Sequence, residues 1–172
     1  MYNDTVTLFC RYESRLGDAW YPTVLRNVHI NMDKSAIMAK YGAESRDSAI
    51  LNVRYTPITA SAIAGLAVAG ISISGNSSRK TAKIMIDVKE YFPPKQWDRQ
   101  TNDQLPSSLT FTDGDKFDFF WVGEWPDDAP ISDDNYTDGF YNYMNRLYDH
   151  VFAITSVGGP YGVIPHFEIM GA

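Results

Sequence analysis

Short segments in which apolar and polar side chains alternate recur along the chain, and this pattern constrains the fold more than any other feature. In residues 5–12 one face carries valine, leucine and cysteine, and residues 20–32 and 48–55 are also typical of strands. A period of two indicates strands that bury one face. A short polar turn containing Gly17 separates the first two segments, so we expect them to form a hairpin.

Two further β patterns lie in the middle of the chain. Residues 82–88 predict a strand in which Ile86 and Val88 face inward. Residues 109–122 favour a hairpin that reverses at Gly114, because an Asp-Gly pair between two strand-like runs is typical of a tight turn. Two consecutive prolines between these segments end regular pairing, since a proline nitrogen has no hydrogen to donate.

The last part of the chain predicts a hairpin over residues 151–170. Its loop is rich in glycine, and apolar side chains alternate on both sides of that loop. We expect Phe152 or Ile154 of the first strand to face inward. Phe167 and Ile169 share one face of the second strand, and we expect them to face inward as well. This hairpin is therefore predicted to belong to the core.

One amphipathic helix is predicted near 139–149, where apolar side chains recur at helical spacing and Asp138 can cap the start. Roughly seven to nine short strands, a single helix and no alternation of strands with helices favour a small antiparallel β-barrel or sandwich. We therefore expect a mainly β protein in which residues 1–172 form one domain. An Ala/Gly-rich insert at 58–76 and an acidic loop at 124–138 exceed a minimal barrel.

Composition argues against several classes of protein. The net charge of −6 and the sequence pI near 4.9 disfavour a protein that binds the nucleic-acid backbone. Cys10 is the one cysteine, which excludes a disulfide within the chain and a multi-cysteine zinc site. The most apolar stretch, residues 58–73, is shorter than the roughly 20 residues of a spanning helix, so no membrane contact is expected. The start of the chain lacks the pattern of a signal peptide, which predicts assembly in a cytoplasm.

The sequence also fails the tests for common catalytic and metal motifs. It has no phosphate-binding glycine loop, and Ser72 lacks the second glycine of a nucleophile elbow. Cys10 lies among apolar neighbours, where a buried, inert thiol is usual. Residues 133–139 lack the glycine and carboxylate positions of a helix–loop–helix calcium site, and His166 with Glu168 favours an ordinary polar pair over metal ligands. We therefore expect no catalytic residue, no cofactor and no metal.

Charge is unevenly distributed along the chain. Residues 111–139 contain nine acidic residues and one basic residue, a net charge of −8 that leaves +2 for the rest of the chain. A polarised molecule favours an acidic face directed at a basic partner or at passing DNA, although a merely solvated loop has the same composition. The candidate acidic face consists of Asp127, Asp128, Asp133, Asp134 and Asp138.

Two segments are candidates for an interface between subunits. Aromatic residues crowd around the acidic loop, and tryptophan and tyrosine are the usual anchors of protein interfaces. Small residues in the Ala/Gly-rich insert allow backbones to approach closely. The candidate interface residues are Gly65, Leu66, Val68, Gly70, Trp121, Trp125, Tyr136 and Tyr141. Bulky substitutions at the two glycines are expected to block assembly and to leave the monomer folded.

Several short motifs together resemble one family. The motifs are 7–12 (Thr-Leu-Phe-Cys-Arg-Tyr), 21–28, 47–55, Trp97, 114–116 (Gly-Asp-Lys), 149–151, 154–157 and 165–169 (Pro-His-Phe-Glu-Ile). They resemble a little-characterised family of proteins from tailed phages and prophages of Gram-positive bacteria, whose members tend to lie among head–tail joining and minor structural genes. The order of the motifs is also similar to that of head-closure and tail-completion subunits, which are small β-barrels that form rings around the DNA exit channel.

This resemblance implies a structural subunit of the virion at the head-to-tail interface, without catalysis. It implies a ring of six or twelve copies, contacts with portal, adaptor or tail proteins of the same virion, and proximity to packaged DNA. It carries no catalytic residues. Two alternatives stay open at this point. One is a virion-surface module that binds carbohydrate or a receptor through the aromatic and acidic residues 121–143; the other is an enzyme with an unrecognised carboxylate site.

Overall fold

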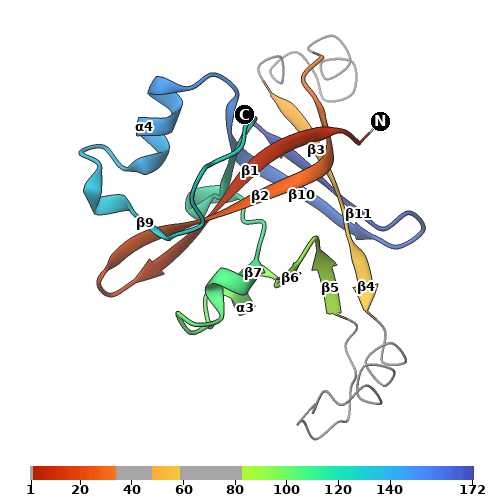
Figure 1. Cartoon of the computed structure of the whole chain (residues 1–172), viewed down its shortest axis with the longest axis horizontal. Coiled ribbons are helices and arrows are strands. Elements are labelled where there is room, and N and C mark those ends of the chain that lie inside the picture. Colours follow the sequence, from red (N-terminus) through yellow and green to blue (C-terminus); the bar gives the residue numbers. More distant parts are fainter. Residues whose placement is uncertain (1, 34–47, 59–82) are drawn as a thin grey trace, which may run out of the picture.

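The computed structural model describes residues 2–33, 48–58 and 83–172, and these residues form two β-sheets with few helices (Figure 1). The larger sheet comprises β1 (Asp4–Ser14), β2 (Gly17–Asn31), β3 (Ala49–Arg54), β8 (Phe119–Trp121), β9 (Ile131–Ser132), β10 (Val151–Tyr161) and β11 (His166–Gly171). Its order is β1-β8-β10-β11-β3-β2, and β2 pairs with β1 again. Six antiparallel strands therefore close into a barrel, and β9 extends it beside β2. The expected mainly β fold is confirmed, as a barrel.

The first two strands form the expected hairpin. They pair antiparallel from Asp4 opposite Val28 to Ser14 opposite Gly17, with one shift of register between Asp4 and Val6. Gly17 has a φ of +113°, a backbone conformation that only glycine adopts readily, so this residue sets the reversal. The valine, leucine and cysteine that the alternation placed on one face are fully buried in the barrel. Phe9 on the opposite face is also buried, because a second apolar cluster covers the outside of β1.

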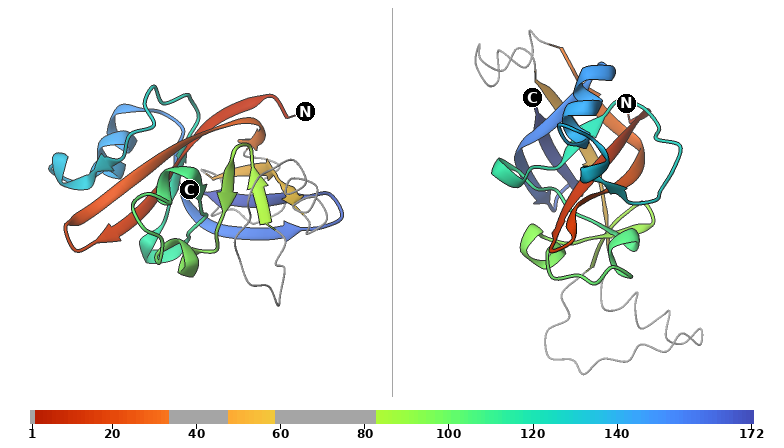
Figure 2. Two further views of the ribbon diagram at one scale, coloured as in Figure 1. Left: turned by 60° about the horizontal axis from the view of Figure 1, so that its bottom comes forward. Right: turned by 90° about the vertical axis from the view of Figure 1, so that its left-hand side faces the viewer.

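A smaller four-stranded sheet packs on the barrel (Figure 2). It contains β4 (Thr56–Ile58), β5 (Lys83–Ile86), β6 (Lys89–Tyr91) and β7 (Ser108–Leu109), and β6 pairs with β7 in parallel. Two short helical segments, α3 (Pro94–Trp97) and a 3-10 turn at Leu105–Ser107, connect β6 to β7. Ile86 and Trp97 from this region are buried in the same core as the barrel strands, so both sheets share one hydrophobic core.

The strand predicted over residues 82–88 is interrupted, which corrects the inward position expected for Val88. β5 ends at Ile86, which is buried, and the chain then turns through Asp87 and Val88 into β6. Asp87 has a φ of +53°, a conformation that aspartate tolerates better than most residues. The reversal leaves the Val88 side chain 79% exposed.

The hairpin expected over residues 109–122 does not form. β7 belongs to the small sheet and β8 to the barrel, and the chain between them makes a 3-10 turn at Gly114–Lys116. The physical reason lies at Asp118. Its buried carboxyl group accepts the Thr112 N–H at 2.8 Å, and its own backbone N–H donates to the Thr112 carbonyl. These contacts hold a closed loop in place of a two-stranded ladder.

The predicted helix and terminal hairpin are both present. α4 (Phe140–Leu147) is shorter than expected, and the Asp138 side chain does not cap it. The carboxylate of Asp133 accepts the Phe140 N–H instead, at 2.8 Å. In the hairpin, Phe167 and Ile169 are buried as predicted, and so are both Phe152 and Ile154, one of which was expected to face inward. The turn lies at residues 162–165. Within the described residues, no helix has both the length and the apolar character required to cross a membrane.

Candidate functional site

The predicted interface aromatics lie in a second apolar cluster outside the barrel. Phe9, Trp20, Phe119, Phe140, Met144 and Val151 form the buried part of this cluster. Trp125 meets Phe9 edge-on with ring centroids 5.6 Å apart, and Tyr141 meets Phe119 in the same way at 5.1 Å. Trp121 and Tyr136 are also half-buried against it. These four rings fasten α4 and the acidic loop to the barrel, and only part of each ring is left for a partner.

The candidate acidic residues have different surroundings. Asp133 is half-buried, and its Oδ1 accepts hydrogen bonds from Trp20 Nε1 at 2.7 Å and from the Phe140 N–H. Asp138 lies 3.4 Å from Arg146 on α4. Asp138 is exposed, and so are Asp127, Asp128 and Asp134. Asp133 therefore has a structural role, and the exposed acidic surface is smaller than the sequence predicts.

Two ionisable groups, one on β1 and one directly before β8, are fully buried. Cys10 is fully buried, and burial raises the pKa of its thiol well above the ordinary value. Asp118 is also fully buried, and burial raises the pKa of its carboxyl to about 8 against the hydrogen bonds from Arg11 and Thr112, which lower it. A thiol held neutral is a poor nucleophile. Sequence reasoning did not single out Asp118, because its position resembles any polar residue beside a Gly-Asp turn.

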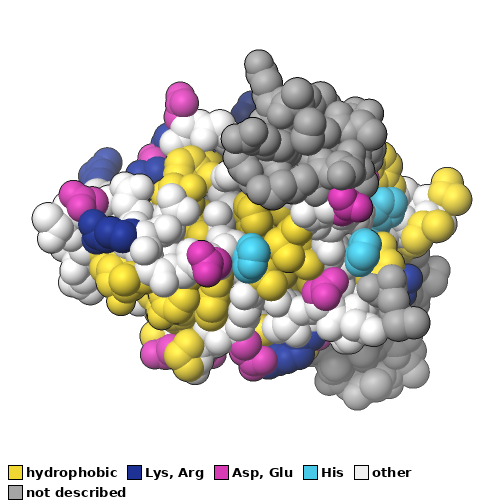
Figure 3. Space-filling model, turned by 90° about the horizontal axis from the view of Figure 1, so that it is seen from above, with side chains coloured by type: hydrophobic (Ala, Val, Ile, Leu, Met, Phe, Trp, Pro, Cys, Tyr) yellow, Lys and Arg dark blue, Asp and Glu magenta, His cyan; other side chains and the backbone are white. Residues whose placement is uncertain are grey.

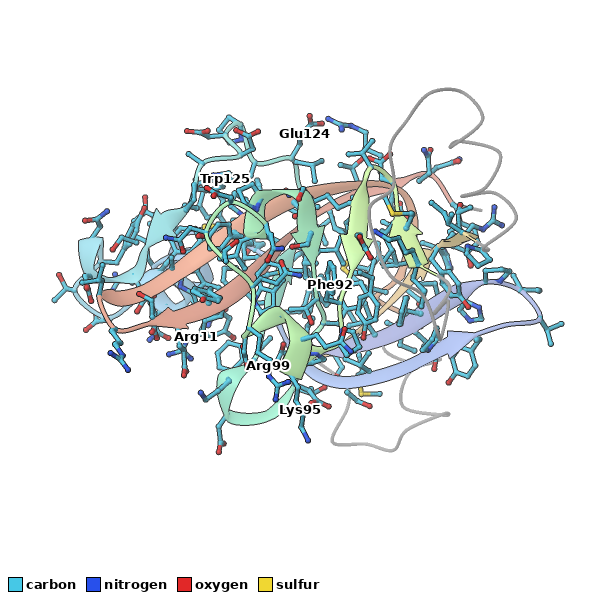
Figure 4. All side chains as sticks on the ribbon, turned by 90° about the horizontal axis from the view of Figure 1, so that it is seen from below. Arg11, Phe92, Lys95, Arg99, Glu124 and Trp125 are labelled. Carbon is cyan, nitrogen blue, oxygen red and sulfur yellow. The ribbon has the colours of Figure 1, made fainter. Side chains whose placement is uncertain are left out.

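A groove follows the side of β2 that faces away from β1. Two cavities of about 640 and 400 Å³ meet in it and share Arg26, Ile86 and Asp87 as lining residues. Glu124, whose carboxylate pairs with Arg26, and Trp125 form the wall contributed by the acidic loop. Figure 4 shows these two neighbouring residues on the loop. The described residues contain no group of three His, Cys, Asp or Glu side chains placed to hold a metal ion.

Apolar side chains are exposed at the ends of the two longest hairpins. Leu16, between β1 and β2, is 96% exposed. Val163 and Ile164, between β10 and β11, are 100% and 63% exposed. The two hairpins extend to opposite sides of the molecule (Figures 1 and 2), and hydrophobic side chains project at the β10–β11 end in Figure 3. The only sequence signal for the first tip is one aliphatic residue within a polar turn.

The remaining candidate interface residues, Gly65, Leu66, Val68 and Gly70, lie outside the described residues. Comparison with known proteins adds one finding. The profile of a family described as a family of unknown function, DUF6751, matches residues 1–172. No curated protein and no solved structure matches the chain.

Proposed function

The chain belongs to the family of unknown function DUF6751, and we propose that it is a structural subunit of a tailed-phage virion at the head-to-tail interface. In this proposal it works by assembling into a ring of six or twelve copies and catalyses no reaction. Its neighbours are the portal, adaptor or tail proteins of the same virion, and the ring surrounds the path of the DNA. The observation that carries the proposal is the placement of exposed apolar tips on opposite sides of a closed barrel.

Exposed aliphatic residues at two separate tips favour contacts between unlike surfaces. A tip on one side of a subunit meets a different surface of its neighbour, and such head-to-tail contacts generate a ring when the rotation closes. Burial of an exposed aliphatic side chain contributes about 1.5–3 kcal/mol, which makes Val163 and Ile164 suitable anchors. Barrel closure also pairs most of the strand edges of the described residues within the subunit, which leaves mainly hairpin tips and outer surfaces for assembly.

The charge of the acidic loop is also consistent with ring assembly around DNA. Its exposed aspartates would repel DNA if they face the channel and would attract a basic neighbour if they face outward. They are Asp127, Asp128, Asp134 and Asp138. In either position the loop is held by the aromatic cluster that fastens it to the barrel.

Light scattering coupled to size-exclusion chromatography tests the assembly. We expect the wild-type protein to elute as a closed ring and Val163→Asp/Ile164→Asp to elute as a folded monomer, because two aspartates cannot be buried against a neighbour. Leu147→Asp is the matched control, since Leu147 is exposed on α4 and lies on neither hairpin tip. Circular dichroism checks that all three proteins keep the same fold.

A wild-type protein that stays monomeric at high concentration contradicts ring assembly. A ring that survives the tip substitutions shows that the hairpin tips do not carry it. Electron microscopy of particles that contain the tip variant gives the corresponding test in the virion, where the proposal predicts heads without attached tails.

A further inference from the structure

Part of β2 lacks a strand partner on the side away from β1. On that side β9 pairs with residues 19–20 and β3 pairs with residues 29–31. Among the strands that the structure describes, none pairs with residues 21–28 there. Asn27, with a φ of +56°, interrupts the extended backbone, so the regular part is residues 21–26, which spans roughly 17 Å at the rise of an extended chain. An open stretch between two antiparallel neighbours is a place where a further strand can add.

The direction of the backbone groups follows from Pro22. Pro22 lies opposite Phe9 of β1 and has no N–H, so this pair is not one that exchanges hydrogen bonds. The Pro22 carbonyl accordingly faces the groove, where the ammonium of Lys89 lies 3.4 Å away. Alternation then turns the N–H and carbonyl of Val24 toward the groove as well. Val24 therefore offers one donor and one acceptor to an added strand.

The groove beside Val24 has aromatic and ionisable lining residues that can contact a peptide. The 400 Å³ cavity is lined by three segments: β2, which includes Val24, the turn between β5 and β6, which includes Val88, and the acidic loop, which includes Trp125. Its ionisable lining comprises four carboxylates, Asp87, Glu124, Asp127 and Asp128, and two cations, Arg26 and Lys89.

The net charge of the lining is negative. The pairing of Arg26 with Glu124 and the hydrogen bond from Lys89 to Thr23, at 2.8 Å, already engage both cations. An aromatic side chain beside carboxylates favours a lysine or arginine side chain, through cation–π and ionic contacts.

We infer that this groove binds an extended, basic segment of a partner protein, which adds as a strand to β2 at Val24 and places an arginine or lysine beside Trp125 and Asp128. Main-chain hydrogen bonds supply affinity in this mode of recognition, and the side-chain pocket supplies specificity. The inference does not rest on ring assembly, because the groove lies on β2 and the apolar tips lie on the turns.

The probe is a capped synthetic peptide, acetyl-Thr-Val-Arg-Val-Thr-amide, titrated against the full chain. We expect binding at millimolar or lower concentration, a change in tryptophan fluorescence, and slower hydrogen exchange at the Val24 amide. The same peptide with glutamine in place of arginine should bind at least threefold more weakly, as expected for the loss of about 0.7 kcal/mol of ionic contact. A peptide with N-methylated backbone should not bind.

Two pairs of variants locate the site. Asp128→Lys should weaken binding of the arginine peptide at least threefold, whereas Asp134→Lys, on an exposed aspartate of the same loop outside the groove, should not. Val24→Pro should fold, because its nitrogen faces the open side, and should lose binding, whereas Val24→Ala should retain it. If Val24→Pro fails to fold, the comparison of Asp128→Lys with Asp134→Lys still tests whether the peptide binds in the groove.

No binding of the arginine peptide, equal binding of the arginine and glutamine peptides, or equal effects of the two lysine variants each overturn the inference. The tip variant Val163→Asp/Ile164→Asp should bind the peptide as the wild type does. Loss of the ring with retained peptide binding, or the reverse, separates the two proposals.

Discussion

Asp118 shows how one buried carboxyl organises the barrel. It is fully buried, and its two oxygens accept the N–H groups of Arg11 at 2.7 Å and Thr112 at 2.8 Å. Its own carbonyl accepts the Ile154 N–H at 2.8 Å. One residue thereby joins β1, the loop before β8 and β10. A buried polar group that makes all of these bonds is costly to replace, since each unpaired partner loses its hydrogen bond without regaining water.

We expect Asp118→Asn to lower the free energy of unfolding by about 1–3 kcal/mol at pH 5, because its amide nitrogen would face a backbone N–H. The folded pKa of about 8 lies above the ordinary 3.8, so the folded protein binds the extra proton. The wild type therefore loses stability as pH rises from about 4 to 8, and the variant lacks this loss. In urea titrations the gap between the two proteins should close between pH 5 and pH 8 and then reverse, with the variant the more stable protein at pH 8.

Asp115→Asn provides the control for this pH dependence, because Asp115 is exposed in the same loop. Its stability should follow that of the wild type at every pH. A gap between wild type and Asp118→Asn that stays constant from pH 5 to pH 8 would show that the carboxyl is ionised in the folded protein.

At the scale of elements, helix α4 is held by side chains from outside the helix. Phe140 and Met144 are buried against the aromatic cluster, while Leu147 on the same helix is 58% exposed. Asp133 links the start of α4 to Trp20 of β2 through a single carboxylate oxygen. A helix of eight residues is marginal by itself, so these tertiary contacts determine whether it forms.

Asp133→Ala should therefore destabilise the protein by about 1–3 kcal/mol, because it leaves the Trp20 indole and the Phe140 N–H without their acceptor. Asp134→Ala, at the exposed neighbouring position, should change stability by no more than about 0.5 kcal/mol. Hydrogen exchange of the α4 amides measures the local effect. Equal effects of the two substitutions would mean that Asp133 does not anchor the helix.

The terminal strand β11 is a second element whose position in the barrel predicts a large contribution to stability. It pairs with β10 on one side and with β3 on the other, and Phe167 is fully buried. We expect Phe167→Ala to cost about 3–5 kcal/mol. Val163→Ala, at a fully exposed position of the same hairpin, should be nearly neutral in thermal unfolding.

Deletion of residues 163–172 removes β11 and opens the barrel, so it should abolish soluble folding. A stable, folded truncation would show that the strand is an appendage.

At the scale of the whole molecule, barrel closure predicts cooperative unfolding. None of the six barrel strands can leave without breaking two sets of pairings. Cys10 lies inside, fully buried, with a raised thiol pKa. Alkylation of Cys10 should require global opening, so the free energy from labelling by iodoacetamide should equal that from urea unfolding.

A cysteine introduced at the exposed turn provides the reference for this experiment. In Cys10→Ala/Leu16→Cys the thiol should react in the folded protein without urea, since position 16 is almost fully exposed. If Cys10 reacts at low urea with a shallow dependence on concentration, the barrel opens locally, and the closed barrel is not one cooperative unit.

Alternation along the chain was enough to predict the strands that make the barrel. It identified the β1–β2 hairpin, the β10–β11 hairpin and the burial of Phe167 and Ile169, because each of these is a local pattern with a period of two. The position of the helix followed from spacing in the same way. These features depend only on residues that are close together in the sequence, so local patterns are enough to predict them.

The pairing between distant segments was decided by tertiary structure. An Asp-Gly pair predicted a hairpin at Gly114, but burial of Asp118 against β1 separated the two strands into different sheets. Asp138 was the nearer candidate to cap α4, but Asp133 lies within reach of Trp20 and satisfies two donors. The groove along β2 likewise exists only because β3 and β9 pair with different ends of one strand. Such contacts join residues far apart in sequence, and their free energy depends on the assembled core, which local patterns do not encode.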